Sequence, residues 1–318
     1  MVCVTGGSGF VGQRLVRGLE ISGFDIRLLT REKKPTSNQK QYFLADLVDK
    51  NISLNGLLDD VSVVYHCAGE IKNTALMHAL HVDGTRRLLD EVRSKIKATN
   101  KPIHWVQLSS VGSYGKPIGL ASEFRVVTET TACNPKGEYE VTKTLADELV
   151  LQLASSEPLF SYTILRPSNV IGENMPNQSL LALVSMIKKR LFFYIGSRSA
   201  VATYIHVDDV VAALMKCGTD FRARGQVFNL SNDCAWSEIV FAIANGEGVK
   251  PPNLCLPQAP LRILVKLLSR ILSIPLTQER IDALVSHTYY STNKIKAVLG
   301  FVPQDYIPSA IASIFKEK

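Results

Sequence analysis

Residues Thr5–Gly12 read TGGSGFVG and place Gly6, Gly9 and Gly12 three positions apart. The apolar run Val2–Thr5 has the character of a buried strand, and a helical pattern follows the glycines. Glycines at this spacing allow a tight turn, a close approach of the backbone to a pyrophosphate, and close packing of helix on strand. The first helical turn then offers free N–H groups to the phosphates. This stretch therefore predicts a dinucleotide-binding βαβ unit.

Short apolar runs alternate with helical patterns along the first half of the chain. The predicted strands are Val2–Thr5, Ile26–Thr30, Val61–His66, Ile103–Ser109 and Tyr162–Arg166, and the predicted helices are Phe10–Ser22, Leu76–Arg93 and Tyr139–Ala154. Strands that alternate with helices predict a parallel sheet built from right-handed crossovers. Beyond Pro167 the alternation loosens into a helix over Leu180–Arg190, strands over Ala202–His206 and Val227–Leu230, and further helices.

We therefore predict an α/β fold, with a Rossmann-type doubly wound parallel sheet and a smaller, discontinuous C-terminal substrate domain. Residues 1–168 and 201–234 are assigned to the NAD(P)-binding domain, and residues 169–200 and 235–318 to the substrate-binding domain.

Composition excludes several classes of protein. The 318 residues are 46% hydrophobic and 20% charged, as expected for a globular chain. We expect neither a secretory segment nor a membrane-spanning helix, because no long uncharged apolar run is present. The six cysteines are scattered, which favours reduced thiols and a cytoplasmic location. Histidine and cysteine spacing predicts no metal site, and the net charge of +7 favours phosphate-bearing small molecules rather than nucleic acid.

The residue after the second predicted strand bears on cofactor choice. NAD-selective folds usually place a carboxylate there, where it binds the ribose hydroxyls. Here Arg31 occupies that place, and a guanidinium can pair with the 2′-phosphate of NADP. We predict NADP as the preferred cofactor, with NAD as the alternative.

Tyr139 and Lys143 are four residues apart on a predicted helix and therefore share one of its faces. A nearby ammonium lowers the pKa of a phenol, which would make Tyr139 a usable general acid or base for a hydroxyl or ketone. Ser110 follows a predicted strand and can hydrogen-bond the substrate oxygen. Ser110, Tyr139 and Lys143 follow the glycine loop in this chain order, and together they predict a hydride-transfer active site.

The chain resembles the extended short-chain dehydrogenases of the NAD-dependent epimerase/dehydratase group along most of its length. The motifs that carry the resemblance are the glycine loop, Asp46–Leu47, His66–Gly69, Ser109–Gly115, Tyr139 with Lys143, Arg166–Gly172, Tyr204–Asp209 and Lys296–Pro303. The resemblance implies Ser110, Tyr139 and Lys143 as catalytic residues. It implies a cofactor site formed by Gly6, Gly9, Phe10, Val11, Gly12, Arg31, Asp46, Leu47, Cys67, Ala68, Gly69, Tyr139, Lys143 and Pro167. It implies substrate contacts from Ser110, Val111, Tyr139 and Asn169.

Departures from the family pattern bear on the substrate. His81 stands where the family usually carries asparagine, and Ala202 lies where nucleotide-sugar epimerases often carry an arginine for the diphosphate. Asn169, in contrast, matches an asparagine that faces the diphosphate in such epimerases. Val111 and Gly112 replace the acidic pair of the dehydratases, so dehydration is not expected.

The leading functional hypothesis is 4-keto reduction or epimerisation of a nucleotide-activated sugar, in polysaccharide biosynthesis. The alternative is a 3β-hydroxysteroid- or dihydroflavonol-type reductase with an apolar substrate, favoured by the apolar stretch Leu261–Leu276 and the missing arginine. A non-enzymatic dinucleotide-binding regulator is the third hypothesis, and the intact catalytic residues argue against it.

Two interaction surfaces are predicted. The resemblance implies a homodimer formed through the helices over Leu76–Arg93 and Tyr139–Ala154. Pro260–Leu272 has the pattern of a basic amphipathic helix, with Arg262, Lys266 and Arg270 along one face. We consider both an ordinary packed helix and weak contact with an anionic membrane surface.

Overall fold

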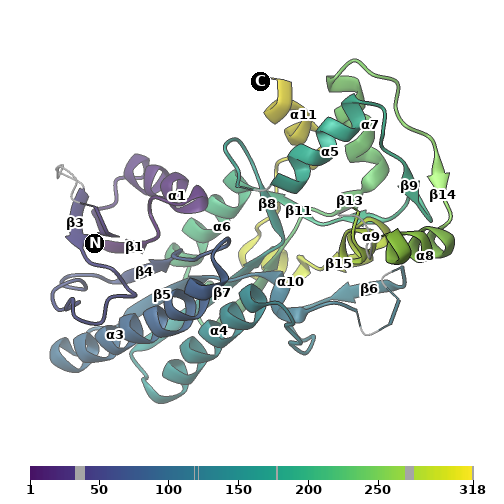
Figure 1. Ribbon diagram of the computed structural model, residues 1–318. Coiled ribbons are helices and arrows are strands. Elements are labelled where there is room, and N and C mark those ends of the chain that lie inside the picture. Colours follow the sequence, from purple (N-terminus) through teal and green to yellow (C-terminus); the bar gives the residue numbers. More distant parts are fainter. Residues whose placement is uncertain (33–39, 118, 121, 177, 269–275, 317–318) are drawn as a thin grey trace.

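The computed structural model describes residues 1–32, 40–117, 119–120, 122–176, 178–268 and 276–316 (Figure 1). Seven parallel strands form its central sheet, in the order β12-β7-β5-β4-β1-β2-β3. They are β1 Val2–Thr5, β2 Ile26–Thr30, β3 Lys40–Leu44, β4 Val63–His66, β5 Ile103–Leu108, β7 Phe160–Pro167 and β12 Gln226–Leu230. The predicted Rossmann-type parallel sheet is confirmed.

Helices cover both faces of this sheet (Figure 1). They are α1 Phe10–Ile21 and α6 Val207–Thr219 on one face, and α3 Thr85–Thr99 and α4 Glu138–Ser156 on the other. Leu15 of α1 and Leu214 of α6 belong to one buried cluster, and Leu88 of α3 and Val150 of α4 belong to another. Because both faces are covered, the central strands β1, β4 and β5 are buried along almost their whole length.

In the strand order, β1 lies between β2 and β4. The chain adds β2 and β3 on one side of β1 and then β4, β5 and β7 on its other side, so the order reverses at β1. In a doubly wound sheet, ligands bind where the strand order reverses, beyond the carboxyl ends of the strands. The loop after β1 carries the glycines, and the loop after β4 carries Cys67, Ala68 and Gly69. The fold therefore brings these two predicted cofactor segments to the same edge.

A second group of elements packs around its own apolar cluster, which includes Ile187, Trp236 and Ile311. Its helices are α5 Gln178–Lys188, α7 Trp236–Gly246, α8 Gln258–Leu268, α9 Gln278–Val285 and α11 Ile307–Lys316. Four strand pairs complete it: β8 Asn169–Ile171 with β11 Tyr204–His206, β9 Tyr194–Ile195 with β14 Cys255–Leu256, β10 Val201–Ala202 with β13 Cys234–Ala235, and β6 Phe124–Val127 with β15 His287–Tyr290.

The domain boundaries drawn from the sequence stay a prediction. One helix complicates them, because α10 Asn293–Leu299 lies within the range assigned to the smaller domain. Its Ile295 and Leu299 are nevertheless part of the buried cluster that contains Leu15 of α1. The last part of the chain therefore returns to the central sheet before α11 packs against α7.

Two predicted elements are each divided in the structure. The expected helix Leu76–Arg93 becomes α2 Thr74–His78, the π-helical turn η1 Ala79–Gly84, and α3. The expected strand Ala202–His206 is interrupted at Thr203, so that β10 pairs with β13 while β11 pairs with β8. In both cases tertiary partners, rather than local propensity, determine the break.

Candidate active site

In the glycine loop, the positions of Gly6 and Gly12 leave no room for a side chain. Gly6 has a φ of +69°, and a Cβ on it would lie 2.6 Å from the backbone of Cys67 and Ala68. A Cβ on Gly12 would lie 2.1 Å from the carbonyl oxygen of Gly6. The loop is therefore pressed against the end of β4, and Gly9 at its tip is exposed. This is the close backbone approach that a pyrophosphate requires at the start of α1.

The residues expected near the adenosine end lie on neighbouring strand ends. Arg31 is exposed and follows β2 directly. The chain beyond β3 runs beside it, because the N–H of Ala45 donates to the carbonyl of Thr30 at 2.9 Å. The carbonyls of Asp46 and Leu47 are held by Arg87, at 3.2 and 2.7 Å. Arg31 and Asp46 therefore share one edge of the sheet.

The loop after β4 connects the glycine loop with the catalytic helix. Gly69 lies next to Lys143, since a Cβ on Gly69 would lie 3.5 Å from the Nζ of that lysine. Cys67 and Ala68, just before it, touch Gly6. The predicted cofactor residues thus form a continuous path from the glycine loop to the catalytic helix. Three other predicted cofactor residues lie on neighbouring elements. Phe10 and Val11 are in the first turn of α1, and Pro167 is the last residue of β7.

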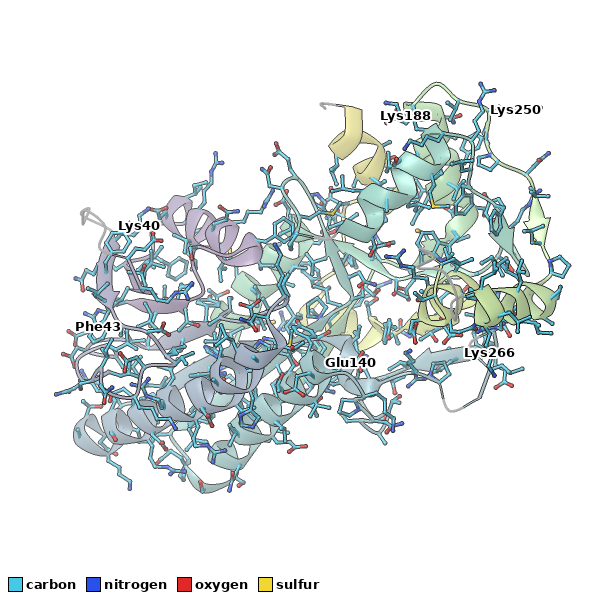
Figure 2. The ribbon with its side chains drawn as sticks, viewed as in Figure 1. Lys40, Phe43, Glu140, Lys188, Lys250 and Lys266 are labelled. Atoms are coloured by element: carbon cyan, nitrogen blue, oxygen red, sulfur yellow. The ribbon has the colours of Figure 1, made fainter. Side chains whose placement is uncertain are left out.

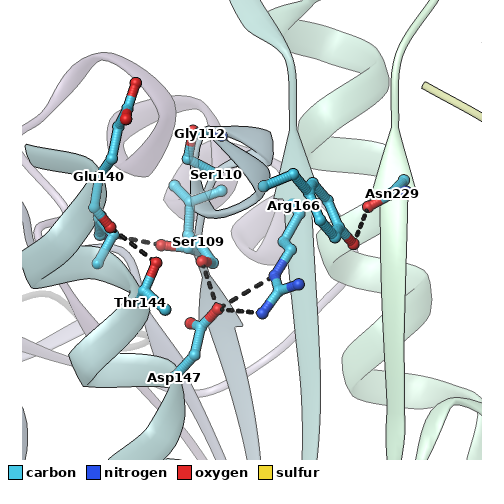
Figure 3. Close-up of polar contacts among 11 residues, drawn as sticks. Ser109, Ser110, Gly112, Glu140, Thr144, Asp147, Arg166 and Asn229 are labelled. Atoms are coloured by element: carbon cyan, nitrogen blue, oxygen red, sulfur yellow. Dashed lines mark hydrogen bonds and ion pairs between the residues drawn. The ribbon is translucent and has the colours of Figure 1, made fainter. Parts of the chain in front are cut away.

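Tyr139 and Lys143 lie one turn apart near the start of α4. The ammonium of Lys143 is buried and donates to the carbonyl oxygen of Leu108, at the end of β5, at 2.8 Å. Two residues further on, the hydroxyl of Ser110 accepts a hydrogen bond from the N–H of Gly112 at 3.0 Å. A Cβ on Gly112 would meet both Ser110 and Glu140, so this turn packs against α4 (Figure 3). Ser110 and Lys143 therefore lie where β5 ends beside α4, and Tyr139 is one turn before Lys143 on that helix.

The titration of the catalytic pair differs from the expectation. Burial raises the pKa of Tyr139 to about 12, and the nearby charge of Asp147 acts in the same direction. Burial also lowers the pKa of Lys143, although Asp147 partly offsets this. The ammonium was expected to lower the pKa of the phenol, but burial and the charge of Asp147 raise it instead. At neutral pH the phenol is therefore protonated.

His81 is a site residue whose part the sequence did not reveal. It lies on the π-helical turn and is almost fully buried. Its Nε2 accepts a hydrogen bond from the N–H of Glu70 at 2.8 Å, and its Nδ1 lies 2.8 Å from the hydroxyl of Thr142. Burial, reinforced by the Lys143 cation, lowers the pKa of His81 to about 3. The neutral ring thus ties the loop after β4 to α4 beside Tyr139.

A buried ion pair lies further along α4, on the face that carries Tyr139 and Lys143. Asp147 accepts hydrogen bonds from Arg166 of β7 at 3.0 and 3.2 Å and from the hydroxyl of Ser109 at 2.7 Å (Figure 3). The guanidinium of Arg166 lies over the ring of Tyr114, whose hydroxyl donates to Asn229 of β12 at 2.8 Å. This network joins α4, β5, β7 and β12 behind the catalytic residues. Its clue in the sequence was an acid one turn after Lys143.

The predicted substrate residues lie at the ends of β5 and β7. Val111 is buried in the turn after Ser110, and Asn169 is exposed, with its side-chain amide donating to the carbonyl of Thr203 at 3.0 Å. Ala202, at the position where related epimerases carry arginine, is buried opposite Cys234 in the β10–β13 pair. This position therefore cannot present a cation to a diphosphate.

A second acid lies close to Asn169. The carboxylate of Asp233 accepts from the hydroxyl of Ser231 and, at 2.7 Å, from the N–H of Tyr290. The hydroxyl oxygen of Ser231 also lies 2.7 Å from that of Ser168. Burial raises the pKa of Asp233 to about 6. These contacts hold β15 and the end of β12 together at the edge where the substrate is expected.

Comparison with known proteins agrees with this geometry. Residues 2–231 match the model of the NAD dependent epimerase/dehydratase family. The chain belongs to this family. It is therefore an NAD(P)-dependent enzyme of the short-chain dehydrogenase type, an epimerase or a dehydrogenase. Among the described residues, no group of histidine, cysteine and acidic side chains is suited to hold a metal ion.

Relatives within and near the family act on different substrates. A sterol-4-alpha-carboxylate 3-dehydrogenase (decarboxylating) from Mus musculus is 25% identical, over 94% of this chain and 86% of its own length. A putative UDP-glucose 4-epimerase from Methanocaldococcus jannaschii is 28% identical, over 67% of this chain and 72% of its own. The solved structure of MoeE5 in complex with UDP-glucose and NAD has a TM-score of 0.71 at 23% identity, covering 98% and 96% of the two chains.

Proposed function

We propose that the protein interconverts a ketone and a secondary alcohol, with hydride transfer between the substrate carbon and a nicotinamide. The observation that carries this proposal is the position of Lys143, which lies beside Gly69 on the path from the glycine loop, beside the end of β5 before Ser110, and one turn after Tyr139 on α4. When bound along this path, the dinucleotide would supply the hydride. Every remaining requirement, namely positioning of the substrate oxygen and movement of one proton, falls to residues of this chain.

The roles follow from the contacts. Tyr139 donates its phenolic proton to the oxygen of the ketone, or removes that proton in the reverse direction. Ser110 hydrogen-bonds the same oxygen and fixes its position. Lys143 places a positive charge beside the phenol, and its own position is fixed by the carbonyl of Leu108. That charge stabilises the phenolate left after proton transfer.

For the substrate we propose a nucleotide-activated sugar, reduced or epimerised at its 4-position, for use in polysaccharide biosynthesis. Two observations support this. Asn169 is exposed at the carboxyl edge of the sheet, where its amide can face a diphosphate. Relatives named as UDP-glucose 4-epimerases, 26–28% identical to this chain, cover two thirds or more of it.

An apolar alcohol or ketone is the second candidate, and a specific observation favours it. Ala202 is buried where an arginine would contact the diphosphate, and Val111, Tyr114 and Val127 form an apolar cluster with Tyr290 close to Ser110. Three mammalian sterol-4-alpha-carboxylate 3-dehydrogenases match over 94% of the chain. A steroid-like or flavonol-like ketone would need no diphosphate contact.

For the cofactor we propose NADP rather than NAD, because Arg31 is exposed at the end of β2, where it can reach a 2′-phosphate. We also propose a cytoplasmic enzyme, which is supported by the six free cysteines. A homodimer through α3 and α4 stays a prediction. The structure describes no helix with the length and apolarity to cross a bilayer.

The test combines binding with turnover. Wild-type protein is mixed with NADPH or NADH and, in separate reactions, with a 4-keto nucleotide sugar and a 3-keto steroid, and nicotinamide absorbance is followed. Tyr139→Phe should lose at least about a hundredfold in rate, since general acid catalysis contributes about that much. Its thermal shift with cofactor should match the wild type. The proposal would be refuted if NADPH were oxidised with neither of the two substrates. It would also be refuted if the Tyr139→Phe variant were as active as the wild type.

A further inference from the structure

Helix α8 presents apolar side chains to solvent. Ile263, Leu264 and Leu267 are 63%, 51% and 54% exposed, and Pro260 is also exposed. Positions 260, 263, 264 and 267 follow the i, i+3, i+4, i+7 spacing of one helix face. We call these four residues the apolar stripe.

The opposite face of α8 is fully engaged with the protein. Val265 is buried with Ile281 and Val285 of α9. Arg262 also turns toward α9, where it binds Asp282 at 2.7 Å and Gln278 at 3.1 Å. Arg262 is therefore paired with α9, whereas Lys266, one turn later, is exposed. Arg270, and the end of the predicted helix at 269–272, lie outside the described residues.

The chain around α8 has an unusual charge distribution. Residues 248–278 contain four basic residues and no carboxylate, and residues 174–207 likewise contain four basic residues and no carboxylate. The two segments lie together, because β9 pairs with β14 and Arg198 donates to the carbonyl of Asn253. Figure 2 shows Lys266 beside α8, and Lys188 with Lys250 at the far end of this part of the molecule. Two of the basic side chains are paired, Arg262 with Asp282 and Lys188 with Glu247 at 2.8 Å. The stripe thus lies beside the exposed Lys266, in a part of the chain with an excess of basic residues.

We propose that the apolar stripe of α8 rests on an anionic lipid bilayer, with its side chains among the acyl chains and the neighbouring cations near the head groups. The combination of a continuous apolar face with cationic surroundings is what such a surface binds. A second copy of the chain fits less well, because a symmetric contact would bring two carboxylate-free segments together and like charges would repel.

This inference goes beyond the proposed function and is tested without turnover. Full-length wild type is co-sedimented with vesicles of phosphatidylcholine, and with vesicles of equal parts phosphatidylcholine and phosphatidylglycerol, at low and high salt. The stripe variant is Ile263→Ser with Leu267→Ser. The matched control is Ile21→Ser with Phe221→Ser, which removes side chains that are 77% and 76% exposed on α1 and on η3 Phe221–Ala223.

We expect wild type and control to bind the anionic vesicles, to bind them more weakly at high salt, and to leave the neutral vesicles in the supernatant. The stripe variant should bind at least about tenfold more weakly, since two apolar contacts are lost. Absence of wild-type binding, or equal binding of the stripe variant and wild type, would overturn the proposal. The proposal would also be overturned if light scattering without lipid showed a dimer for wild type and control but a monomer for the stripe variant.

A second measurement guards against misfolding of the stripe variant. Leu264→Trp places a fluorophore in the stripe, whereas the native Trp105 and Trp236 are buried. Its emission should shift to shorter wavelength when anionic vesicles are added, and lipids brominated on the acyl chains should quench it. Unchanged emission in a variant with a wild-type melting temperature would count against the proposal.

Discussion

The imidazole of His81 meets the phenol ring of Tyr139 edge-on, at 83° and with 5.6 Å between the ring centroids. This contact exists because the helix before α3 widens into a π-helical turn, which directs His81 between Glu70 and Thr142. Such turns are frequent at functional sites. The neutral ring forms one wall beside the catalytic phenol, where a charged ring would repel Lys143.

The pH dependence of stability should reveal this neutral histidine. The pKa of His81 falls from 6.5 to about 3 on folding, and that of His66 does the same, in both cases chiefly through burial. Below pH 6.5 the unfolded chain binds protons that the folded chain excludes, so stability falls as the pH drops toward 3. Between pH 7 and 5 each histidine should cost about 2 kcal/mol.

The measurement is urea unfolding of wild type and His81→Asn at both pH values. The asparagine is the residue that the family usually carries and cannot titrate, so the variant should lose the share of the pH effect that His81 contributes, about 2 kcal/mol. Equal slopes for the two proteins would show that His81 does not remain neutral in the fold.

Lys143→Met should reduce turnover by about a hundredfold or more and, in the direction of alcohol oxidation, where the phenolate is needed, should move the onset of activity to higher pH. The methionine keeps the length of the side chain but removes the cation and the hydrogen bond to Leu108. Without the cation the pKa of Tyr139 rises further. Rate-versus-pH profiles of the variant and of Thr144→Val, a neighbour on α4 that bonds only to its own helix, are compared. The same profile in all three proteins would remove Lys143 from the mechanism.

Arg31→Asp should weaken NADP binding by about ten- to a hundredfold and strengthen NAD binding, since a carboxylate repels the 2′-phosphate and accepts from ribose hydroxyls. Calorimetric titration with both cofactors measures the change. The control is Lys101→Asp, the same charge change at the start of β5, on the opposite edge of the sheet. A loss of affinity equal for both cofactors would exclude phosphate recognition by Arg31.

Arg166→Met should lower the free energy of unfolding by about 3–5 kcal/mol, because it leaves the buried Asp147 carboxylate without its partner. Changing Asp147 to leucine as well should recover a large part of that loss, since the uncompensated charge is then gone. Urea unfolding of the single and double variants measures this. A double variant no more stable than Arg166→Met would show that the pair acts through packing alone.

The sequence was most informative where one strong local constraint acts. Strands such as Val2–Thr5 and Ile103–Leu108 are buried on both faces, so their apolar runs are easily recognised. The glycine spacing is equally informative, because close packing of the backbone at Gly6 and Gly12 excludes side chains there. The reaction class followed from Tyr139 and Lys143 because helical periodicity alone places them on one face.

The remainder depends on partners that are distant in the chain. The π-helical turn is fixed by the contacts of His81 with Glu70 and Thr142, which no local pattern encodes. The strand β6 escaped prediction because its partner β15 lies more than 150 residues later. The inward turn of Arg262 likewise depends on Asp282 of α9. The expected depression of the Tyr139 pKa failed for the same kind of reason, since burial is a property of the whole fold.

The return of α10 to the central sheet has a consequence for how the molecule moves and how it can be divided. The chain passes from the sheet to the second cluster after β7 and again after β12, and it passes back at α6 and α10. Several chain segments thus connect the two parts, so any opening that admits substrate has to bend these segments together. Neither part is a contiguous fragment that could be cut out and expressed, and heat or denaturant should melt the two together in one transition.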